Sequence, residues 1–251
     1  MVGMIFAAGL GTRLKPLTDT MPKALVPLAG KPLLQWQVEK LHDAGIREIV
    51  VNVHHFPDMI IEAVRANKGW GCDIRISDER DNLLDTGGGL RKAFRLLMDN
   101  GQWTMGNEPI LACNVDILSN IDLRDVQRRY EQTGISQLVV SDRKTQRYLC
   151  FDENNLLQGW TNIATGEVKP SDIGSRLSDY RKLAFSGIQI LHQDTLALLR
   201  QRQEDKFPLI SFYLDIMRSV PLQAYIPANY RMMDVGKIDQ IEEAERFAES
   251  L

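Results

Sequence analysis

The alternation of short apolar segments with longer amphipathic ones constrains the fold more than any other feature of this sequence. Runs rich in Val, Ile, Leu and Ala recur through the first half of the chain, and segments with apolar residues at helical spacing separate them. The pattern predicts strands at residues 2–7, 46–53, 72–76 and 109–114 and helices at 31–45, 60–64 and 90–98. Because such repeats form right-handed crossovers, we expect an α/β fold with a mostly parallel, doubly wound (Rossmann-like) sheet and helices on both faces.

The second half of the chain is less regular. It predicts strands at residues 136–141, 149–152, 156–160 and 183–191 and helices at 196–202, 209–217 and 238–248. Residues 162–181 are polar, contain glycine, proline and serine, and have no steady period. We therefore expect a long loop there, and loops of that length are often functional.

Composition and charge narrow the class of protein. The 251 residues are 44% hydrophobic and 25% charged with a net charge of −3, as in an ordinary globular chain. A nucleic-acid-binding protein would carry a clustered positive face, so we expect no such partner. The separated Cys72, Cys113 and Cys150 suggest neither a disulfide framework nor a zinc site. With no signal-peptide pattern and no apolar run long enough to span a bilayer, we expect a cytoplasmic protein without a membrane partner.

The first predicted strand ends in a glycine turn, Ala7-Ala8-Gly9-Leu10-Gly11-Thr12-Arg13. Two glycines leave little side chain between backbone and ligand, and the N–H groups of such a turn can bind an anion. Thr12 adds a hydroxyl, Arg13 a fork of donors, and Lys23 a second positive charge. The alternative is an ordinary tight turn, because the spacing lacks the third glycine of dinucleotide-binding loops and the Gly-Lys-Ser/Thr of a P-loop.

Three further positions carry candidate chemistry and also have a purely structural interpretation. Asp85-Thr86-Gly87-Gly88-Gly89 precedes a predicted helix and could simply cap it. Asp116 follows a predicted strand, where a solvated carboxylate is common. Asp234 stands before the last predicted helix and could be a capping residue.

A longer sequence string favours phosphate binding over an ordinary tight turn. It continues from Gly9-x-Gly11-Thr12-Arg13 through Pro16-Leu17-Thr18 and Pro22-Lys23-Ala24-Leu25-Val26-Pro27 to Gly30-Lys31-Pro32-Leu33. This string resembles the signature of the sugar-1-phosphate nucleotidyltransferases, also called nucleoside-diphosphate-sugar pyrophosphorylases. The resemblance covers most of the chain and implies a single nucleotidyltransferase (GT-A-like) domain over 1–251, with a nucleotide-binding half at 1–120 and a sugar-binding half at 121–251. It also implies nucleotidyl transfer from a nucleoside triphosphate to a sugar 1-phosphate, with release of pyrophosphate.

The resemblance assigns roles to matching positions. It implies nucleotide contacts from Ala8, Gly9, Gly11, Thr12, Arg13, Lys23, Thr86 and Gly88. It implies sugar contacts from Asn114 and Gly187, catalytic roles for Arg13, Lys23 and Asp116, and Mg²⁺ binding by Asp116 and Asp234.

Three residues depart from the pattern of the family. Val115 replaces the usual glycine before the first aspartate, and Met232 and Lys237 replace the residues that flank the second motif.

We also expect Lys23, as a loop lysine, to contribute more to turnover than to stability.

Within the family, Leu84-Asp85-Thr86-Gly87-Gly88-Gly89 and Phe185-Ser186-Gly187 look most like the uridylyltransferases that act on N-acetylmuramate 1-phosphate in cell-wall recycling. Mannose-1-phosphate guanylyltransferases stand close to them. A phosphocholine cytidylyltransferase would need an aromatic choline pocket, which Trp160 and Tyr180 leave open. A non-catalytic nucleotide sensor should have lost one of Arg13, Lys23, Asp116 or Asp234, and all four are present. Lys169 is either a sugar-phosphate contact or a solvated lysine, and the oligomeric state cannot be predicted.

Overall fold

Strand β1 (Val2–Phe6) lies inside the parallel part of the central sheet. The computed structural model describes residues 1–99 and 108–251. Strand β1 pairs in parallel with β4 (Glu48–Val53) on one side and with β6 (Ile110–Asn114) on the other, and β5 (Asp73–Asp78) continues the parallel part beyond β4. This part of the sheet follows the strand and helix alternation of the sequence.

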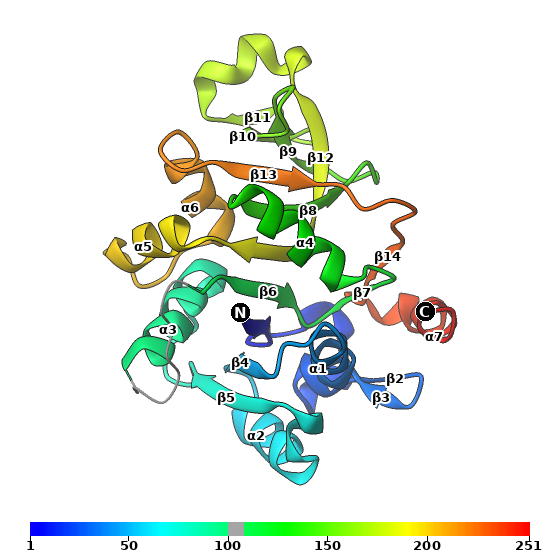
Figure 1. Cartoon of the computed structure of the whole chain (residues 1–251). Helices are drawn as coiled ribbons and strands as arrows, with labels where there is room; N and C mark the ends of the chain where they lie inside the picture. The colour runs from blue at the N-terminus through cyan, green and yellow to red at the C-terminus, as the bar shows by residue number, and fades with distance from the viewer. Residues whose placement is uncertain (100–107) are drawn as a thin grey trace.

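Both faces of these strands are covered, which explains their continuous apolar sequences. All five residues of β1 are buried, and they alternate between two apolar cores: Ile5 belongs to one, and Val2, Met4 and Phe6 to the other. The first core is covered by α1 (Leu33–Asp43), α2 (Pro57–Ala66), α4 (Leu123–Thr133) and α7 (Ile241–Glu249). The second is covered by α3 (Asp85–Asp99), α5 (Gln193–Gln201) and α6 (Leu209–Ile216), which lie together on one side of the sheet in Figure 1.

The second half of the chain extends the same sheet. Strand β12 (Arg181–Leu191) pairs antiparallel with β6 and so joins the two halves, as Figure 1 shows. Antiparallel strands follow on its other edge: β8 (Ser136–Ser141), β9 (Arg147–Phe151), β10 (Leu157–Asn162) and β11 (Glu167–Lys169). Strand β13 (Leu222–Tyr225) pairs in parallel with β8.

Two short sheets complete the described structure. Strand β7 (Ile117–Ser119) pairs antiparallel with β14 (Met232–Asp234), and β2 (Pro27–Leu28) pairs with β3 (Lys31–Pro32). Among the described residues, no helix combines the length and the apolarity needed to cross a bilayer. The predicted α/β fold with a Rossmann-like parallel core and helices on both faces is confirmed.

Two local predictions were wrong. Helix α3 begins at Asp85 and includes the three glycines, which have no room for side chains: Gly87 and Gly88 pack against the segment at 205–207, and Gly89 packs against Glu79 and Asn52. The predicted loop at 162–181 contains β11 and a 3-10 segment (Ser171–Asp179). Backbone pairing with β10 orders part of this polar segment, a tertiary effect that its irregular sequence does not reveal.

Candidate active site

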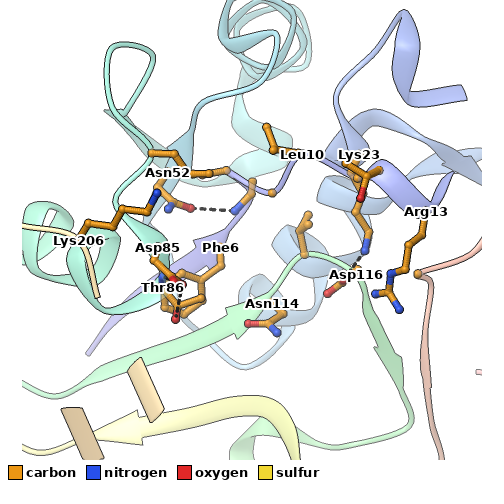
Figure 2. Close-up of a pocket in the computed structure, with 18 residues that line it drawn as sticks. Phe6, Leu10, Arg13, Lys23, Asn52, Asp85, Thr86, Asn114, Asp116 and Lys206 are labelled. Carbon is orange, nitrogen blue, oxygen red and sulfur yellow. Dashed lines mark hydrogen bonds and ion pairs between the residues drawn. The ribbon is translucent and has the colours of Figure 1, made fainter. Parts of the chain in front are cut away.

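A cavity of about 550 Å³ opens at the carboxyl ends of the parallel strands. Phe6 at the end of β1, Asn52 near the end of β4 and Asn114 at the end of β6 all line it. Open α/β sheets bind ligands at this edge, because the turns that follow neighbouring strands meet there. Figure 2 shows the labelled side chains around the cavity, with Asp85, Thr86 and Lys206 at one end and Lys23, Asp116 and Arg13 at the other.

The glycine turn after β1 forms one wall of this cavity. Every residue from Ala7 to Arg13 lines it, including the predicted Ala8, Gly9 and Thr12. Gly11 has a φ of +64°, and a Cβ there would lie 2.8 Å from Thr18 Cγ2, so this position needs glycine. The Thr18 hydroxyl donates to the Gly11 carbonyl at 2.8 Å and fixes the turn. A Cβ at Gly9 would meet nothing within 4 Å, which leaves space beside the backbone.

The two predicted metal ligands lie close together although 117 residues separate them in the sequence: Asp234 is the last residue of β14, and Asp116 lies in the turn just before β7, the strand that pairs with β14. Asp234 pairs with Ile117 in the β7 and β14 ladder, and the Val235 N–H donates to the Asp116 carbonyl at 2.9 Å. The Asp116 carboxylate forms an ion pair with Lys23, drawn in Figure 2. Lys23 itself is only 7% exposed.

Lys23 therefore is not the loop lysine that the sequence suggested. It begins a short 3-10 segment (Lys23–Leu25), and its side chain is buried against Asp116 at one end of the cavity, here called the acidic end. Removing its charge would leave the Asp116 carboxylate without its cation in a partly buried place. The premise that Lys23 is a loop lysine is contradicted, and we now expect its replacement to lower stability as well as turnover.

Arg13 reaches the turn that follows β14. A Cβ on Gly236 would lie 2.9 Å from Arg13 Nη2 and 2.8 Å from Asp234 Oδ1, so the missing side chain lets both groups approach this turn. Loss of water around Asp234 and repulsion from the Asp116 carboxylate raise the pKa of Asp234, and Lys23 and Arg13 oppose this rise. The acidic end thus carries two carboxylates and two cations.

This carboxylate pair fits Mg²⁺ better than a metal held by protein ligands alone. Within residues 1–99 and 108–251, no cluster of three or more His, Cys, Asp or Glu side chains could hold an ion. Magnesium needs few protein ligands, because it keeps waters and binds substrate phosphates. The mutual repulsion that raises the pKa of Asp234 is also what a divalent cation between Asp116 and Asp234 would relieve.

A buried polar network supports the opposite end of the cavity. Asn52 Oδ1 accepts from the Ala7 N–H at 2.8 Å, and Asn52 Nδ2 donates to Glu79 Oε1 at 2.7 Å. Glu79 Oε2 accepts from the Leu84 N–H at 3.1 Å. Asn52 is 2% and Glu79 1% exposed, so direct buried hydrogen bonds link the phosphate turn to the segment before Thr86.

The whole of this architecture corresponds to one known family. A family model described as nucleotidyl transferase matches residues 2–250. The chain belongs to the nucleotidyl transferase family. The recognition of sugar-1-phosphate nucleotidyltransferases from the glycine string is thereby confirmed.

Two relatives of this nucleotidyl transferase have named activities. It is 44% identical over 117 residues to N-acetylmuramate alpha-1-phosphate uridylyltransferase of Caulobacter vibrioides, a match that covers 46% of this chain and 45% of the relative. It is 27% identical over 245 residues to mannose-1-phosphate guanyltransferase of Yarrowia lipolytica, covering 94% of this chain and 61% of the relative. The first match thus spans less than half the length of that relative.

A solved structure supports the fold of this nucleotidyl transferase. A putative glucose-1-phosphate thymidylyltransferase from Bacillus anthracis superposes with a TM-score of 0.80 over 100% of this chain and 96% of its own. The two sequences are 15% identical, so this likeness concerns the fold alone.

Not every residue predicted for the site lines the cavity. Thr86 and Asn114 do, and Gly187, with a φ of +70°, lies behind Asn114, where a Cβ would come within 2.8 Å of Asn114 Nδ2. Gly88 is buried, and a Cβ there would lie 2.1 Å from the Asp205 carbonyl, so its missing side chain serves helix packing. Lys169 pairs with Glu167 at 2.8 Å on β11 and does not line the cavity.

Several polar groups at or near this site could not be predicted from the sequence. Asn52 and Lys206 line the cavity, and neither belongs to a recognisable motif. Arg143 does not line the cavity, but it donates to the Phe185 carbonyl of β12 at 3.0 Å, and its charge lowers the pKa of Asp234. Only the folded chain brings these residues to the strand ends.

Proposed function

We propose that this chain transfers a uridylyl group from UTP to N-acetylmuramate 1-phosphate and releases pyrophosphate. The observation that carries nucleotidyl transfer is the end of the cavity lined by Arg13, Lys23 and Asp116, to which the pairing of β14 with β7 brings Asp234. The choice of UTP and of this sugar rests on the relative from Caulobacter vibrioides.

The reaction needs no protein nucleophile. A phosphate oxygen of the sugar 1-phosphate attacks the α-phosphorus of UTP, a new P–O bond forms, and the bond from the α-phosphorus to the oxygen shared with the β-phosphate breaks. The electron pair leaves with pyrophosphate. The protein must hold two anions in line and neutralise the charge that develops on the leaving group.

The residues divide this work. The backbone of the phosphate turn and the Arg13 guanidinium would hold the β- and γ-phosphates, and the Lys23 ammonium would contact the α-phosphate and the incoming phosphate. Asp116 and Asp234 would hold Mg²⁺, which supplies charge neutralisation and alignment of the triphosphate oxygens. Lys23 would then exchange part of its contact with Asp116 for substrate phosphate.

The sugar side offers a group suited to this acceptor. N-acetylmuramate differs from N-acetylglucosamine by a lactyl ether that ends in a carboxylate, so an enzyme that prefers it needs a cation away from the phosphates. Arg143, anchored to the Phe185 carbonyl of β12, supplies such a cation. We assign the lactyl carboxylate to Arg143.

The test is a matrix of substrates. Pyrophosphate release is measured with Mg²⁺ across ATP, CTP, GTP, UTP and dTTP, each with N-acetylmuramate 1-phosphate, N-acetylglucosamine 1-phosphate, mannose 1-phosphate and phosphocholine. The strongest signal is expected for UTP with N-acetylmuramate 1-phosphate. A strong signal only for GTP with mannose 1-phosphate would favour the activity of the Yarrowia lipolytica relative instead, and triphosphate binding without any turnover would favour a nucleotide sensor.

A further inference from the structure

The end of the cavity away from the carboxylate pair holds two charged side chains that the proposed mechanism does not use. Lys206 and Asp85 both line the cavity there, as Figure 2 shows. The proposed function places the triphosphate at the opposite end, beside Lys23 and Arg13, which puts the base at this one. Leu10, 43% exposed, and Leu83 also line the cavity and can contact the flat faces of a base.

The orientation of Asp85 is fixed by its own turn. Its backbone has a φ of +60°, and its Oδ1 accepts from the Thr86 N–H at 2.6 Å and from the Thr86 hydroxyl at 3.3 Å. The Thr86 hydroxyl oxygen in turn accepts from the Leu209 N–H at 2.9 Å. In the described part of the chain, Asp85 forms no ion pair and its Oδ2 has no hydrogen-bond donor, so one carboxylate oxygen remains to accept.

Lys206 stands on a segment that is tied to the same turn. The Gly87 N–H donates to the Phe207 carbonyl at 2.9 Å, and the Phe207 N–H donates to the Leu84 carbonyl at 3.3 Å. Arg91 of α3 pairs with Asp205 at 2.6 Å. The Lys206 ammonium forms no hydrogen bond or ion pair with residues 1–99 or 108–251, so its donors are free at the same end of the cavity as Asp85.

A free cation and a free carboxylate oxygen at one end of the cavity match one kind of base edge. Uracil, thymine and guanine present a keto oxygen, which accepts, next to a ring N–H, which donates. Cytosine and adenine present an amino group next to a bare ring nitrogen, which reverses donor and acceptor. We propose that Lys206 donates to the keto oxygen and Asp85 Oδ2 accepts from the ring N–H, so that this site selects keto bases.

This inference rests on the proposed function, since it assigns the base of the same triphosphate. Selectivity depends on the free-energy penalty for binding the wrong base as much as on the contacts with the right one. Cytosine would place its amino group against the ammonium and its bare nitrogen against the carboxylate, so the exposed Lys206 and the half-buried Asp85 would be covered by the base without gaining a partner. A site of this kind discriminates more strongly than an apolar pocket of matching shape.

The test compares UTP with CTP in the wild type and two variants. Calorimetric binding of each triphosphate is measured without sugar 1-phosphate, together with kcat/KM for transfer. Lys206→Met should weaken UTP about tenfold and leave CTP unchanged, and Asp85→Asn should lower the UTP to CTP ratio because an amide can present either donor or acceptor. Lys182→Met, an exposed lysine of β12 outside the cavity, is the matched control and should leave the ratio unchanged.

The outcomes separate the two proposals. Equal binding of CTP and UTP by the wild type, or an unchanged UTP to CTP ratio in Lys206→Met, overturns the proposed base contacts of Lys206 and Asp85 even if transfer is observed. Transfer with GTP and rejection of CTP and ATP would support the base edge and contradict the choice of UTP. Absence of transfer removes the proposed function, while the binding ratios in the same variants still test Lys206 and Asp85.

Discussion

At the scale of single residues, the burial of Lys23 changes what its replacement should do. The ammonium is enclosed and paired with Asp116, so it supports the folded state before any substrate binds. In the proposed reaction the same ammonium faces two phosphates. Stability and turnover therefore depend on one charge, and a second substitution can separate them.

Lys23→Met should lower kcat by about two to three powers of ten, because it removes a charge from the transferring phosphate. It should also lower the free energy of unfolding by roughly 1 to 3 kcal/mol, since Asp116 loses its partner. Adding Asp116→Asn should restore part of the stability and none of the activity. Urea unfolding and steady-state rates measure both. Lys15→Met, which removes an exposed pair with Asp19, should change neither by much, and an equal loss in that control would refute the role of Lys23.

Arg143→Met tests the assignment of the lactyl carboxylate. The KM for N-acetylmuramate 1-phosphate should rise about tenfold, because a cation to carboxylate contact is lost. The KM for N-acetylglucosamine 1-phosphate, which has no such carboxylate, should not change. Equal changes for the two sugars would mean that Arg143 acts only by holding the Phe185 carbonyl.

At the scale of elements, the site depends on strand ends that are tied together by side chains. Asn52 at the end of β4 bonds both the turn after β1 and Glu79, which follows β5. A buried network of this kind fixes its members only while every group is satisfied. The phosphate turn and the segment before Thr86 should therefore both shift when the network around Asn52 is broken.

Asn52→Leu should raise the KM for UTP about tenfold and lower the free energy of unfolding by roughly 1 to 3 kcal/mol for each group left unpaired. Thr195→Val is the matched control, because it breaks a buried hydrogen bond to Ser136 (2.8 Å) far from the cavity. It should lower stability while leaving the KM unchanged. If both variants alter the KM alike, the network around Asn52 has no special link to the nucleotide.

At the scale of the whole molecule, the fold was more predictable than the site. Apolar runs such as Val2–Phe6 are continuous because both faces of the strand are covered, and that pattern is visible in the sequence. The proximity of Asp116 and Asp234 followed from the family signature alone. Lys206 could not be predicted, because only packing of the segment at 205–207 on α3 brings it to the cavity.

The stability of the whole chain should carry a pH signature from Glu79. Burial raises the pKa of Glu79, and hydrogen bonds from Asn52 and Leu84 and the charges of Lys92 and His54 oppose this only in part. The unfolded chain therefore releases this proton first, near the ordinary value of 4.5, and the contribution of Glu79 to stability falls as the pH rises through the raised pKa.

Glu79→Gln, which cannot ionise, removes this dependence. The free energy of unfolding of the wild type minus that of the variant should be constant below pH 4.5 and decrease above it, as urea titrations across the pH range would measure. A difference that is flat, or that increases with pH, would show that Glu79 ionises at least as easily in the folded chain as in the unfolded one.

Label tracing tests nucleotidyl transfer itself most directly. UTP labelled at the α-phosphate and UTP labelled at the γ-phosphate are each incubated with the protein, Mg²⁺ and N-acetylmuramate 1-phosphate, and the products are separated. We predict that the α label enters the sugar nucleotide, that the γ label leaves in pyrophosphate, and that Asp116→Asn abolishes both. Release of the γ label as inorganic phosphate, or transfer that survives Asp116→Asn, would contradict attack on the α-phosphorus at the carboxylate end of the cavity.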